Sequence, residues 1–289
     1  MKTCKSLLLI SGIVLLCMMT TAAADAPTIT FKFTPVIVGK LNTTVGGINN
    51  TGVMVGQYMS KPTVTQSFML NGKTLTQIQH PNGSNTICMH INSSGAIVGN
   101  YTDSKSVTRG FLYQNGKFTD ILGPAGATSS RANGINDSGA IVGSYTVSGG
   151  GHPQGFLLQG KSYKILKVPG AVATIPTGIN NKGEIVMYFE GANESVGSAL
   201  YNGKTFKMIN VPEAVESDAE DINNSEDVVY QWFDQNFHGH GALLHNGQYY
   251  KFDCPKSMST AGFGLNDRGI VVGACEPDGQ IGEGFKATY

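Results

Sequence analysis

The apolar residues of this chain fall in short runs that are separated by glycine and asparagine, and no convincing helical period follows the first residues. The pattern is clearest at Arg131–Ile135, Ala140–Tyr145, Gly155–Leu158 and Ser162–Lys167, with turn residues between the segments. Each segment has the length of a β-strand, and short turns bring successive strands together in antiparallel order. This part of the chain therefore predicts a four-stranded antiparallel sheet.

The same unit occurs six times. Its first hairpin reads Gly-Ile-Asn-x-x-Gly-x-Ile-Val-Gly-x-Tyr, and the copies are GINNTGVMVGQY from Gly47, HINSSGAIVGNY from His90, GINDSGAIVGSY from Gly134, GINNKGEIVMYF from Gly178, DINNSEDVVYQW from Asp221 and GLNDRGIVVGAC from Gly264. The shared asparagines are Asn49, Asn92, Asn136, Asn180, Asn223 and Asn266, which are 43, 44, 44, 43 and 43 residues apart. Such regular spacing is the signature of a repeat protein.

The repeated asparagine and glycine belong to the first hairpin turn. In the third copy the turn is Asn136-Asp137-Ser138-Gly139, in which asparagine suits the first position of a type I turn and glycine suits the last. A second turn in each copy contains Asn-Gly or Gln-Gly, where glycine accepts a left-handed backbone. We therefore interpret the repeated asparagines as structural rather than catalytic.

A four-stranded antiparallel unit of about 40 residues, repeated four to eight times, describes a propeller blade. We predict an all-β fold over residues 25–289, a six-bladed β-propeller of four-stranded antiparallel blades. The last repeat stops after its third strand, Gly284–Tyr289, whereas Thr28–Pro35 resembles the fourth strand of another copy. Because an open array would expose strand edges, we expect the N-terminal strand to close the last blade.

The first residues are typical of a secretory signal peptide, predicted over 1–24. Lys2 and Lys5 precede an apolar stretch, Leu7–Met19, and small residues follow at Ala22–Ala24. We expect a secreted or periplasmic protein without a membrane span after signal removal, an uncleaved anchor being the alternative. The formal net charge is zero and no basic run occurs, which argues against a nucleic-acid partner.

Three cysteines, Cys88, Cys254 and Cys275, follow the predicted cleavage site. Cys254 and Cys275 fall near the junction of the fifth and sixth blades and could form a disulfide. The alternative is that all three are small buried apolar residues. The sequence alone does not choose between these two arrangements.

The repeat phrases resemble those of the extracellular HAF-repeat proteins of bacteria, over about Thr28 to Tyr289. The second phrase departs from that pattern, because Gly110-Phe111 and Gly155-Phe156 hold glycine where the family has alanine. The resemblance implies export and a propeller-like fold. It implies no reaction, so no catalytic residue is carried over.

Variable loops on a rigid scaffold commonly carry function, which directs attention to one rim of the predicted disc. The loops between second and third strands, and the connections between blades, gather there, and we expect a glycan or protein to bind this variable-loop rim of a monomer. Blades four and five depart most from the repeat, through drift or through a ligand surface. The candidate ligand-binding residues are Trp232, Asp234, His238, His240, Glu220 and Asp221.

Two further hypotheses concern single side chains. His238 and His240, with Asp234 or Glu220, could hold a divalent metal, although a solvated polar loop explains the same residues. His90 and Asp221 replace the glycine of the repeat in blades two and five and should lie near the channel. Because these blades are opposite in a ring of six, we do not expect the two side chains to pair directly.

The sequence contains no P-loop, dinucleotide fingerprint, His-Glu-x-x-His or Gly-x-Ser-x-Gly motif. We expect a binding or scaffolding module for a glycan or protein, without enzymatic activity and without a cofactor. The alternative is a propeller hydrolase or lyase that acts on extracellular polysaccharide. In that case blade-five carboxylates and His238 or His240 would serve as acid and base.

Overall fold

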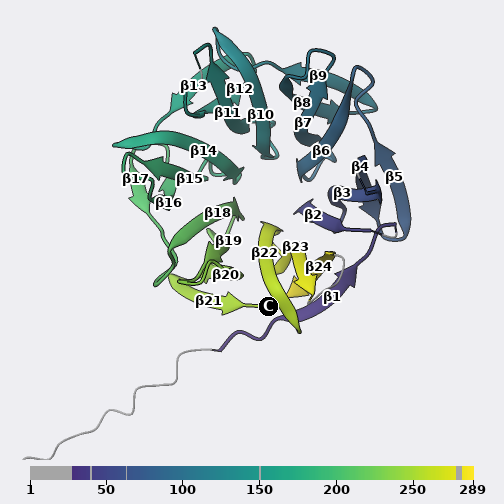
Figure 1. Cartoon of the computed structure of the whole chain (residues 1–289), viewed down its shortest axis with the longest axis vertical. Coiled ribbons are helices and arrows are strands. Elements are labelled where there is room, and N and C mark those ends of the chain that lie inside the picture. The colour runs from purple at the N-terminus through teal and green to yellow at the C-terminus, as the bar shows by residue number, and fades with distance from the viewer. Residues whose placement is uncertain (1–27, 40, 63, 150, 278–281) are drawn as a thin grey trace, which may run out of the picture.

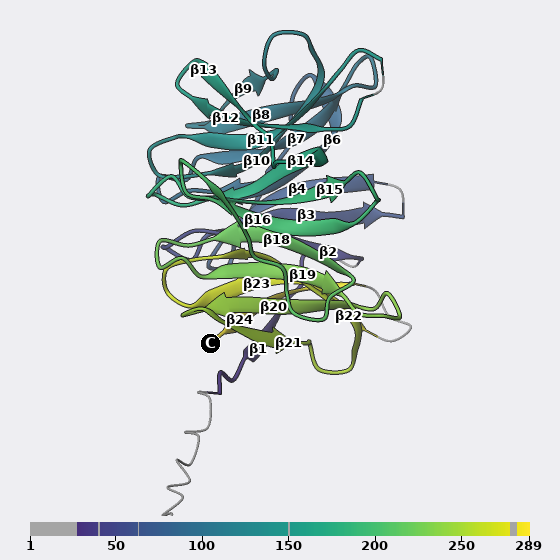
Figure 2. The same ribbon diagram turned by 90° about the vertical axis from the view of Figure 1, so that its left-hand side faces the viewer.

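The chain folds as a six-bladed β-propeller in which every blade is a four-stranded antiparallel sheet (Figure 1). The computed structural model describes residues 28–39, 41–62, 64–149, 151–277 and 282–289. The strands run across the disc between its two rims (Figure 2). The predicted fold class is confirmed, whereas the signal peptide predicted over 1–24 lies outside the described residues. No described helix is long and apolar enough to cross a membrane.

Each of the first five blades uses four consecutive strands, and the first of them lies at the centre of the ring (Figure 1). The strands are β2 (Thr43–Ile48), β3 (Met54–Lys61), β4 (Val64–Asn71) and β5 (Thr74–Ile78) in blade one; β6 (Gly83–Ile91), β7 (Ile97–Asp103), β8 (Thr108–Gln114) and β9 (Lys117–Ile121) in blade two; β10 (Ala127–Ile135), β11 (Ile141–Val147), β12 (Gln154–Gln159) and β13 (Ser162–Leu166) in blade three; β14 (Ala171–Ile179), β15 (Ile185–Gly191), β16 (Val196–Tyr201) and β17 (Phe206–Met208) in blade four; and β18 (Glu216–Ile222), β19 (Val228–Phe233), β20 (Gly239–His245) and β21 (Gln248–Phe252) in blade five.

Blade six joins the two ends of the chain. It contains β22 (Ser257–Leu265), β23 (Ile270–Pro277) and β24 (Glu283–Thr288), and its outer strand is β1 (Lys32–Val36). Strand β1 pairs antiparallel with β24 along its whole length. The predicted closure is therefore confirmed. Phe33 adds apolar contact, because its ring lies 5.3 Å from the ring of Phe285 on β24.

The core consists of six buried apolar clusters, and each draws residues from two neighbouring blades. Leu166 of blade three and Ile185 of blade four share one cluster, and Val55 and Ile97 join blades one and two in another. Because no blade buries its faces alone, the clusters make the closed ring the unit of stability.

A disulfide joins Cys254 after β21 to Cys275 on β23, and thereby links blades five and six. Of the two arrangements that the sequence left open, the structure therefore has the bridge. Cys88 is free and buried. Burial raises the pKa of its thiol to about 12, so Cys88 is an inert core residue.

Two departures from the repeat in blades four and five are core residues. A Cβ at Gly143 of blade three would lie 2.0 Å from the carbonyl oxygen of Arg131. Met187 and Tyr230 occupy the equivalent positions of the next two blades and are fully buried. Tyr230 donates its hydroxyl to the Ile209 carbonyl at 3.0 Å. These two substitutions therefore adapt the interior of the blades and do not contribute to an exposed surface.

Candidate functional site

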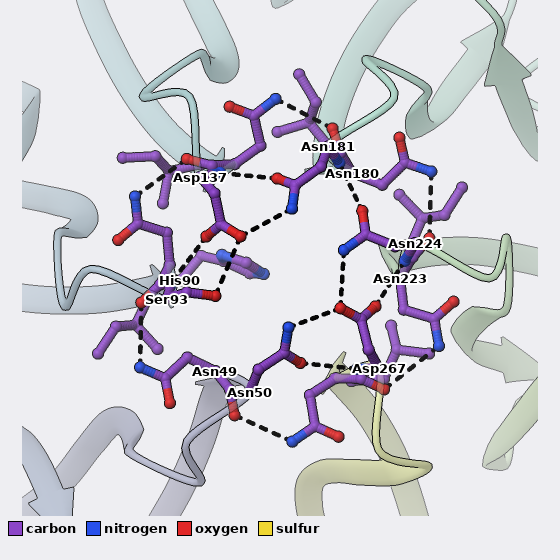
Figure 3. Close-up of a pocket in the computed structure, with 18 of the residues that line it drawn as sticks. Asn49, Asn50, His90, Ser93, Asp137, Asn180, Asn181, Asn223, Asn224 and Asp267 are labelled. Atoms are coloured by element: carbon purple, nitrogen blue, oxygen red, sulfur yellow. Dashed lines mark hydrogen bonds between the residues drawn. The ribbon is translucent and has the colours of Figure 1, made fainter.

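The rim formed by the first hairpin turns is closed by a ring of asparagine side chains (Figure 3). The Nδ2 group of each repeated asparagine donates to the carbonyl oxygen of the next repeated asparagine, at 3.0 to 3.3 Å. The donors are Asn49, Asn92, Asn136, Asn180, Asn223 and Asn266, and the last one returns to Asn49. The Oδ1 atom of each asparagine accepts hydrogen bonds within its own turn. One residue thus shapes the hairpin and joins neighbouring blades.

The next residue of each turn forms a second, incomplete ring. Ser93, Asp137, Asn181, Asn224 and Asp267 each donate their backbone N–H to the side-chain oxygen of the following blade. The sixth link is missing because Ser93 would have to accept it, and a serine side chain is shorter than that of asparagine or aspartate. The space between the turns has a volume of about 50 Å³. Its polar groups largely bond to one another, so this rim is mainly structural.

His90 and Asp221 pair directly across the channel, with 3.0 Å between His90 Nε2 and Asp221 Oδ2. The sequence-based expectation that they would not pair is therefore wrong. Glycine at the equivalent position of the other blades lets the inner strands approach closely: a Cβ at Gly178 would lie 2.7 Å from the Asp221 Cα. The channel is consequently narrow enough there for one histidine to reach the opposite blade.

Hydrogen bonds satisfy the Asp221 carboxylate. It accepts the backbone N–H groups of Ile222 and Leu265 in addition to the imidazole of His90. Burial is the largest single influence and opposes the imidazolium form, but the charge and hydrogen bond of Asp221, together with the charge of Asp137, outweigh it and raise the pKa of His90 above its usual value. The pair blocks the middle of the channel and forms the floor of a cavity on its other side.

That cavity has a volume of about 440 Å³ and lies toward the variable-loop rim. Every inner strand carries a register shift just before its Gly-Ile-Asn phrase, for example between Ala132 and Gly134. A β-bulge of this kind re-aims the extra side chain. The bulged residues Gly46, Met89, Asn133, Thr177, Glu220 and Phe263 all line the cavity. The fold thus directs one position from each blade to a common centre.

Further residues of the inner strands and of the strands beside them complete the wall of the cavity. It contains amides at Gln57 and Asn100, an aromatic ring at Tyr188 and the guanidinium of Arg131. Arg131 Nη1 lies 3.4 Å from Asn100 Oδ1, and Arg131 is otherwise exposed. The cavity therefore combines apolar surface with groups that donate and accept hydrogen bonds.

The carboxyl groups of β18 are concentrated on one side of this region. Burial, reinforced by the charges of Asp218 and Asp221, raises the pKa of Glu220 well above its usual range. Burial and then Glu216 raise the pKa of Asp218 to about 7. Burial and these carboxylates also raise the pKa of Tyr188 to about 12, which keeps its hydroxyl protonated. Tyr188 therefore enters the cavity as a neutral hydrogen-bonding group at neutral pH, and the raised pKa of Glu220 favours the protonated form of its carboxyl group.

Three buried polar atoms of the described residues have no hydrogen-bond partner: Gln57 Oε1, His90 Nδ1 and Asp218 Oδ1. Gln57 and His90 both line the cavity. Most buried polar atoms in folded proteins are paired, and each exception requires an explanation such as a ligand or solvent. The unpaired atoms thus point to the cavity as the place where a polar molecule would be held.

The six residues selected from the sequence do not form one site. Glu220 lines the cavity and Asp221 lies in its floor, whereas Trp232, Asp234, His238 and His240 do not line it. Trp232 is only 7% exposed, and its ring stacks on His240 with centroids 4.6 Å apart. The indole N–H is donated to the Gly241 carbonyl at 3.1 Å. Most of the tryptophan is therefore used in packing within blade five.

The loop after β19 is shaped by Asp234. Its Oδ1 accepts the backbone N–H groups of Asn236 and His238 at 2.8 and 2.9 Å. His240 Nδ1 lies 3.0 Å from Asp253 Oδ1. Among the described residues, no three histidine, cysteine, aspartate or glutamate side chains are grouped so as to hold a metal ion. Glu220 and the loop residues therefore do not make the ligand set of the metal hypothesis.

Comparisons with known proteins bear on the fold. No family model and no curated protein sequence matches the chain. Similar solved structures include TolB from Acinetobacter baumannii, with a TM-score of 0.57 and 10% identity over 80% of this chain and 63% of that chain. The SapL1 lectin in complex with alpha methyl fucoside has a TM-score of 0.53 and 11% identity over 82% and 89%.

A third similar structure is the β-propeller domain of the trilobed protease from Pyrococcus furiosus, with a TM-score of 0.53 and 14% identity over 85% of this chain and 79% of that domain. At such low identities the likeness shows the shared β-propeller fold alone. One of the three is a lectin and another is a domain of a protease, so the cavity of this chain must be interpreted from its own residues.

The sequence analysis missed Arg131, Asn133, Tyr188 and Gln57 as cavity residues. A signal was present, because Arg131 and Asn133 stand five and three positions before the repeated Asn136. The same two positions in other blades hold further inner-strand residues that line the cavity: Thr44, Gly46, Ile87, Met89, Ile175, Thr177, Glu220 and Phe263. Comparison of these positions across the repeats would have shown a single arginine among mainly apolar and neutral residues.

Proposed function

We propose that this chain is an exported glycan-binding propeller and that it holds a sugar in the channel cavity. The observation that carries the proposal is the convergence of one bulged residue from each blade on a cavity with an unpaired amide oxygen, Gln57 Oε1. The volume of about 440 Å³ lies within the range of small-molecule sites. It suits a sugar unit better than a folded protein domain.

The chemistry of the wall supports a sugar. A sugar ring presents hydroxyl groups around its edge and C–H groups on its faces, so it binds where amides and hydroxyls lie beside aromatic rings. Gln57, Asn100 and Asn133 supply amides, and Tyr188 and Phe263 supply rings. The SapL1 lectin, which shares the propeller fold, was crystallised with alpha methyl fucoside. That lectin illustrates that a propeller of this size can hold a saccharide.

Export is part of the same proposal. The features that support it are the predicted signal peptide over 1–24, the resemblance to the HAF-repeat family and the Cys254–Cys275 disulfide. Disulfides persist mainly in oxidising compartments outside the cytosol. We propose that the protein acts in the periplasm or outside the cell.

The hydrolase or lyase alternative draws on Glu220, whose raised pKa is a property of general acids. The partners suggested for it, His238 and His240, do not line the cavity that contains Glu220. Asp234 is the blade-five carboxylate beside these histidines, 3.5 Å from His238 and 3.7 Å from His240, and it lies outside the cavity as they do. Glu220 therefore has neither histidine beside it as a partner. Binding without turnover is the function that the arrangement of these residues favours.

The test is a glycan array followed by calorimetry with the protein lacking residues 1–24. We expect saturable binding of one glycan class without product formation. Tyr188→Ala and Gln57→Ala should each weaken it at least tenfold, with melting curves confirming that the variants are folded. Phe237→Ala is the matched control, because Phe237 is a 63% exposed ring in the blade-five loop and lies outside the cavity.

The result that would contradict the cavity is the reverse pattern. If Phe237→Ala and His238→Ala abolish binding while Tyr188→Ala and Gln57→Ala do not, the ligand binds the blade-five loop. Release of shorter saccharides that depends on Glu220 would instead establish the hydrolase or lyase.

A further inference from the structure

Most charges around the channel cavity are neutralised inside the protein. Asp221 is paired with His90 at 3.0 Å. Burial raises the pKa of Glu220 well above its usual range and the pKa of Asp218 to about 7, so both carboxyl groups hold a proton more readily than exposed ones do. The carboxyl groups that face the cavity therefore carry less negative charge than their number suggests.

Arg131 is the exception. It is the only lysine or arginine among the residues that line the cavity, and no described carboxylate lies within ion-pair distance of it. Its one side-chain contact is the long bond to Asn100 Oδ1 at 3.4 Å. A guanidinium presents five N–H donors in a planar fork that matches a carboxylate. Most of these donors remain available.

A second donor lies in the floor. The Nε2 atom of His90 faces Asp221, and its buried Nδ1 atom has no partner among the described residues. When the imidazole is protonated, both ring nitrogens are donors, and Nδ1–H then has no acceptor within the protein. Protonated Glu220 can likewise donate one hydrogen bond. The cavity thus contains an excess of donors, which an anionic acceptor would satisfy.

We propose that the glycan held in the cavity carries a carboxylate and that Arg131 determines this specificity. This inference rests on the proposed function and names the class of sugar. The guanidinium binds the carboxylate in a bidentate manner, and the sugar ring lies against the aromatic and amide part of the wall. Glu216 does not line the cavity. It stands two residues before Asp218 on β18, further toward the variable-loop rim, so its charge lies outside the contact between Arg131 and the carboxylate.

The proposal also predicts how the affinity for the glycan changes with pH. The charged and titratable groups of the wall that the argument uses are Arg131 on β10, His90 on β6, Tyr188 on β15 and Glu220 on β18. Asp218 on β18 does not line the cavity, but its charge raises the pKa values of Tyr188 and Glu220. As the pH rises through about 7, Asp218 ionises, and the imidazolium of His90 loses its proton above its usual pKa. Both changes make the cavity less favourable for a bound anion. An acidic glycan should therefore bind more tightly at pH 5.5 than at pH 7.5.

The experiment compares each acidic ligand with its neutral methyl ester. Trigalacturonic acid is titrated beside its fully methyl-esterified form, and sialyllactose beside its carboxyl methyl ester, so that the two pairs distinguish a uronic acid from a sialic acid. We expect one acid to bind at least tenfold more tightly than its neutral partner. Arg131→Gln should remove most of that preference, and Arg131→Lys should restore part of it.

Two controls make the result specific. Arg268→Gln removes an exposed arginine near the opposite rim and should leave the preference intact. Asp218→Asn should reduce the difference between pH 5.5 and pH 7.5, because an asparagine cannot ionise. Melting curves establish that each variant is folded.

The outcomes separate the two proposals. Equal affinity for acid and neutral partner, or an unchanged preference in Arg131→Gln, overturns the carboxylate inference while a glycan-binding propeller remains. Binding confined to neutral glycans does the same. An array without any bound glycan overturns the proposed function and this inference with it.

Discussion

The asparagine ring provides the sharpest test of how this fold is held together, through the substitution Asn136→Ala. Asn136 is 6% exposed. Its Oδ1 atom accepts hydrogen bonds from the Ser138 and Ala140 N–H groups, at 3.1 and 3.0 Å, and from the Ser138 hydroxyl at 2.7 Å. Its Nδ2 group donates to the Asn180 carbonyl at 3.0 Å. Alanine removes all four bonds.

The expected loss of stability follows from the polar groups that are left without their hydrogen-bond partner. A buried donor or acceptor left without a partner costs about 1–3 kcal/mol. Two backbone N–H groups lose their partner, the Asn180 carbonyl keeps only the Gly183 N–H at 3.1 Å, and the turn gives some of these groups access to water. We therefore expect Asn136→Ala to lower the free energy of unfolding by about 3–5 kcal/mol.

The assay is urea unfolding followed by the fluorescence of Trp232, the only tryptophan in the chain. The free energy is obtained by linear extrapolation. Ser138→Ala is the matched control, because it removes only the hydroxyl bond to Asn136 and should cost less than about 1 kcal/mol. If the curves of Asn136→Ala and Ser138→Ala coincide, the asparagine ring does not stabilise the propeller and our reasoning is refuted.

Three further predictions concern closure, the disulfide and titration. Deletion of residues 28–36 removes β1, and calorimetry should show loss of the sharp unfolding transition, whereas an equally sharp transition would argue against closure by this strand. Cys254→Ser opens a bridge between cysteines 21 residues apart and should lower the free energy of unfolding, measured in urea, by about 3 kcal/mol. Identical unfolding of the parent with and without reductant would contradict this prediction. The raised pKa of Asp218, about 7, means that the folded state holds a proton that the unfolded state releases near pH 4. The free energy of unfolding of the parent should therefore fall as the pH rises from about 4 to 7, and the fall should be smaller in Asp218→Asn; the same fall in both proteins would show that Asp218 is not the group responsible.

The repeat made the fold predictable, because the sequence pattern of one blade occurs six times. The strands expected at Arg131–Ile135 and Gly155–Leu158 correspond to β10 and β12, although both strands extend beyond these limits. One register shift lies inside the expected segment of β10, at Asn133, and another lies in its extension, between Ala127 and Ser129. A bulge is set by pairing with the neighbouring strand, and the period of one strand does not reveal it.

The site was less accessible to sequence analysis. The departures in blade five attracted attention, yet Trp232 and Tyr230 differ from the repeat because they pack inside the blade. His90 and Asp221 were placed correctly near the channel, but their pairing was missed because the width of the channel was unknown. Opposite blades are far apart in the chain. Close contacts between the inner strands nevertheless narrow the channel so much that one side chain reaches the opposite blade.

The sequence by itself determined the number of blades, the hairpin turns and the strand that closes the ring, because each follows from local turn chemistry and from the spacing of a repeated phrase. Only the tertiary structure decided which side chains share the cavity. Arg131, Tyr188 and Glu220 come from three different blades and meet because bulges and close glycine contacts aim them at one centre. Convergence of this kind depends on the radius and tilt of the assembled blades, and no single repeat contains that information.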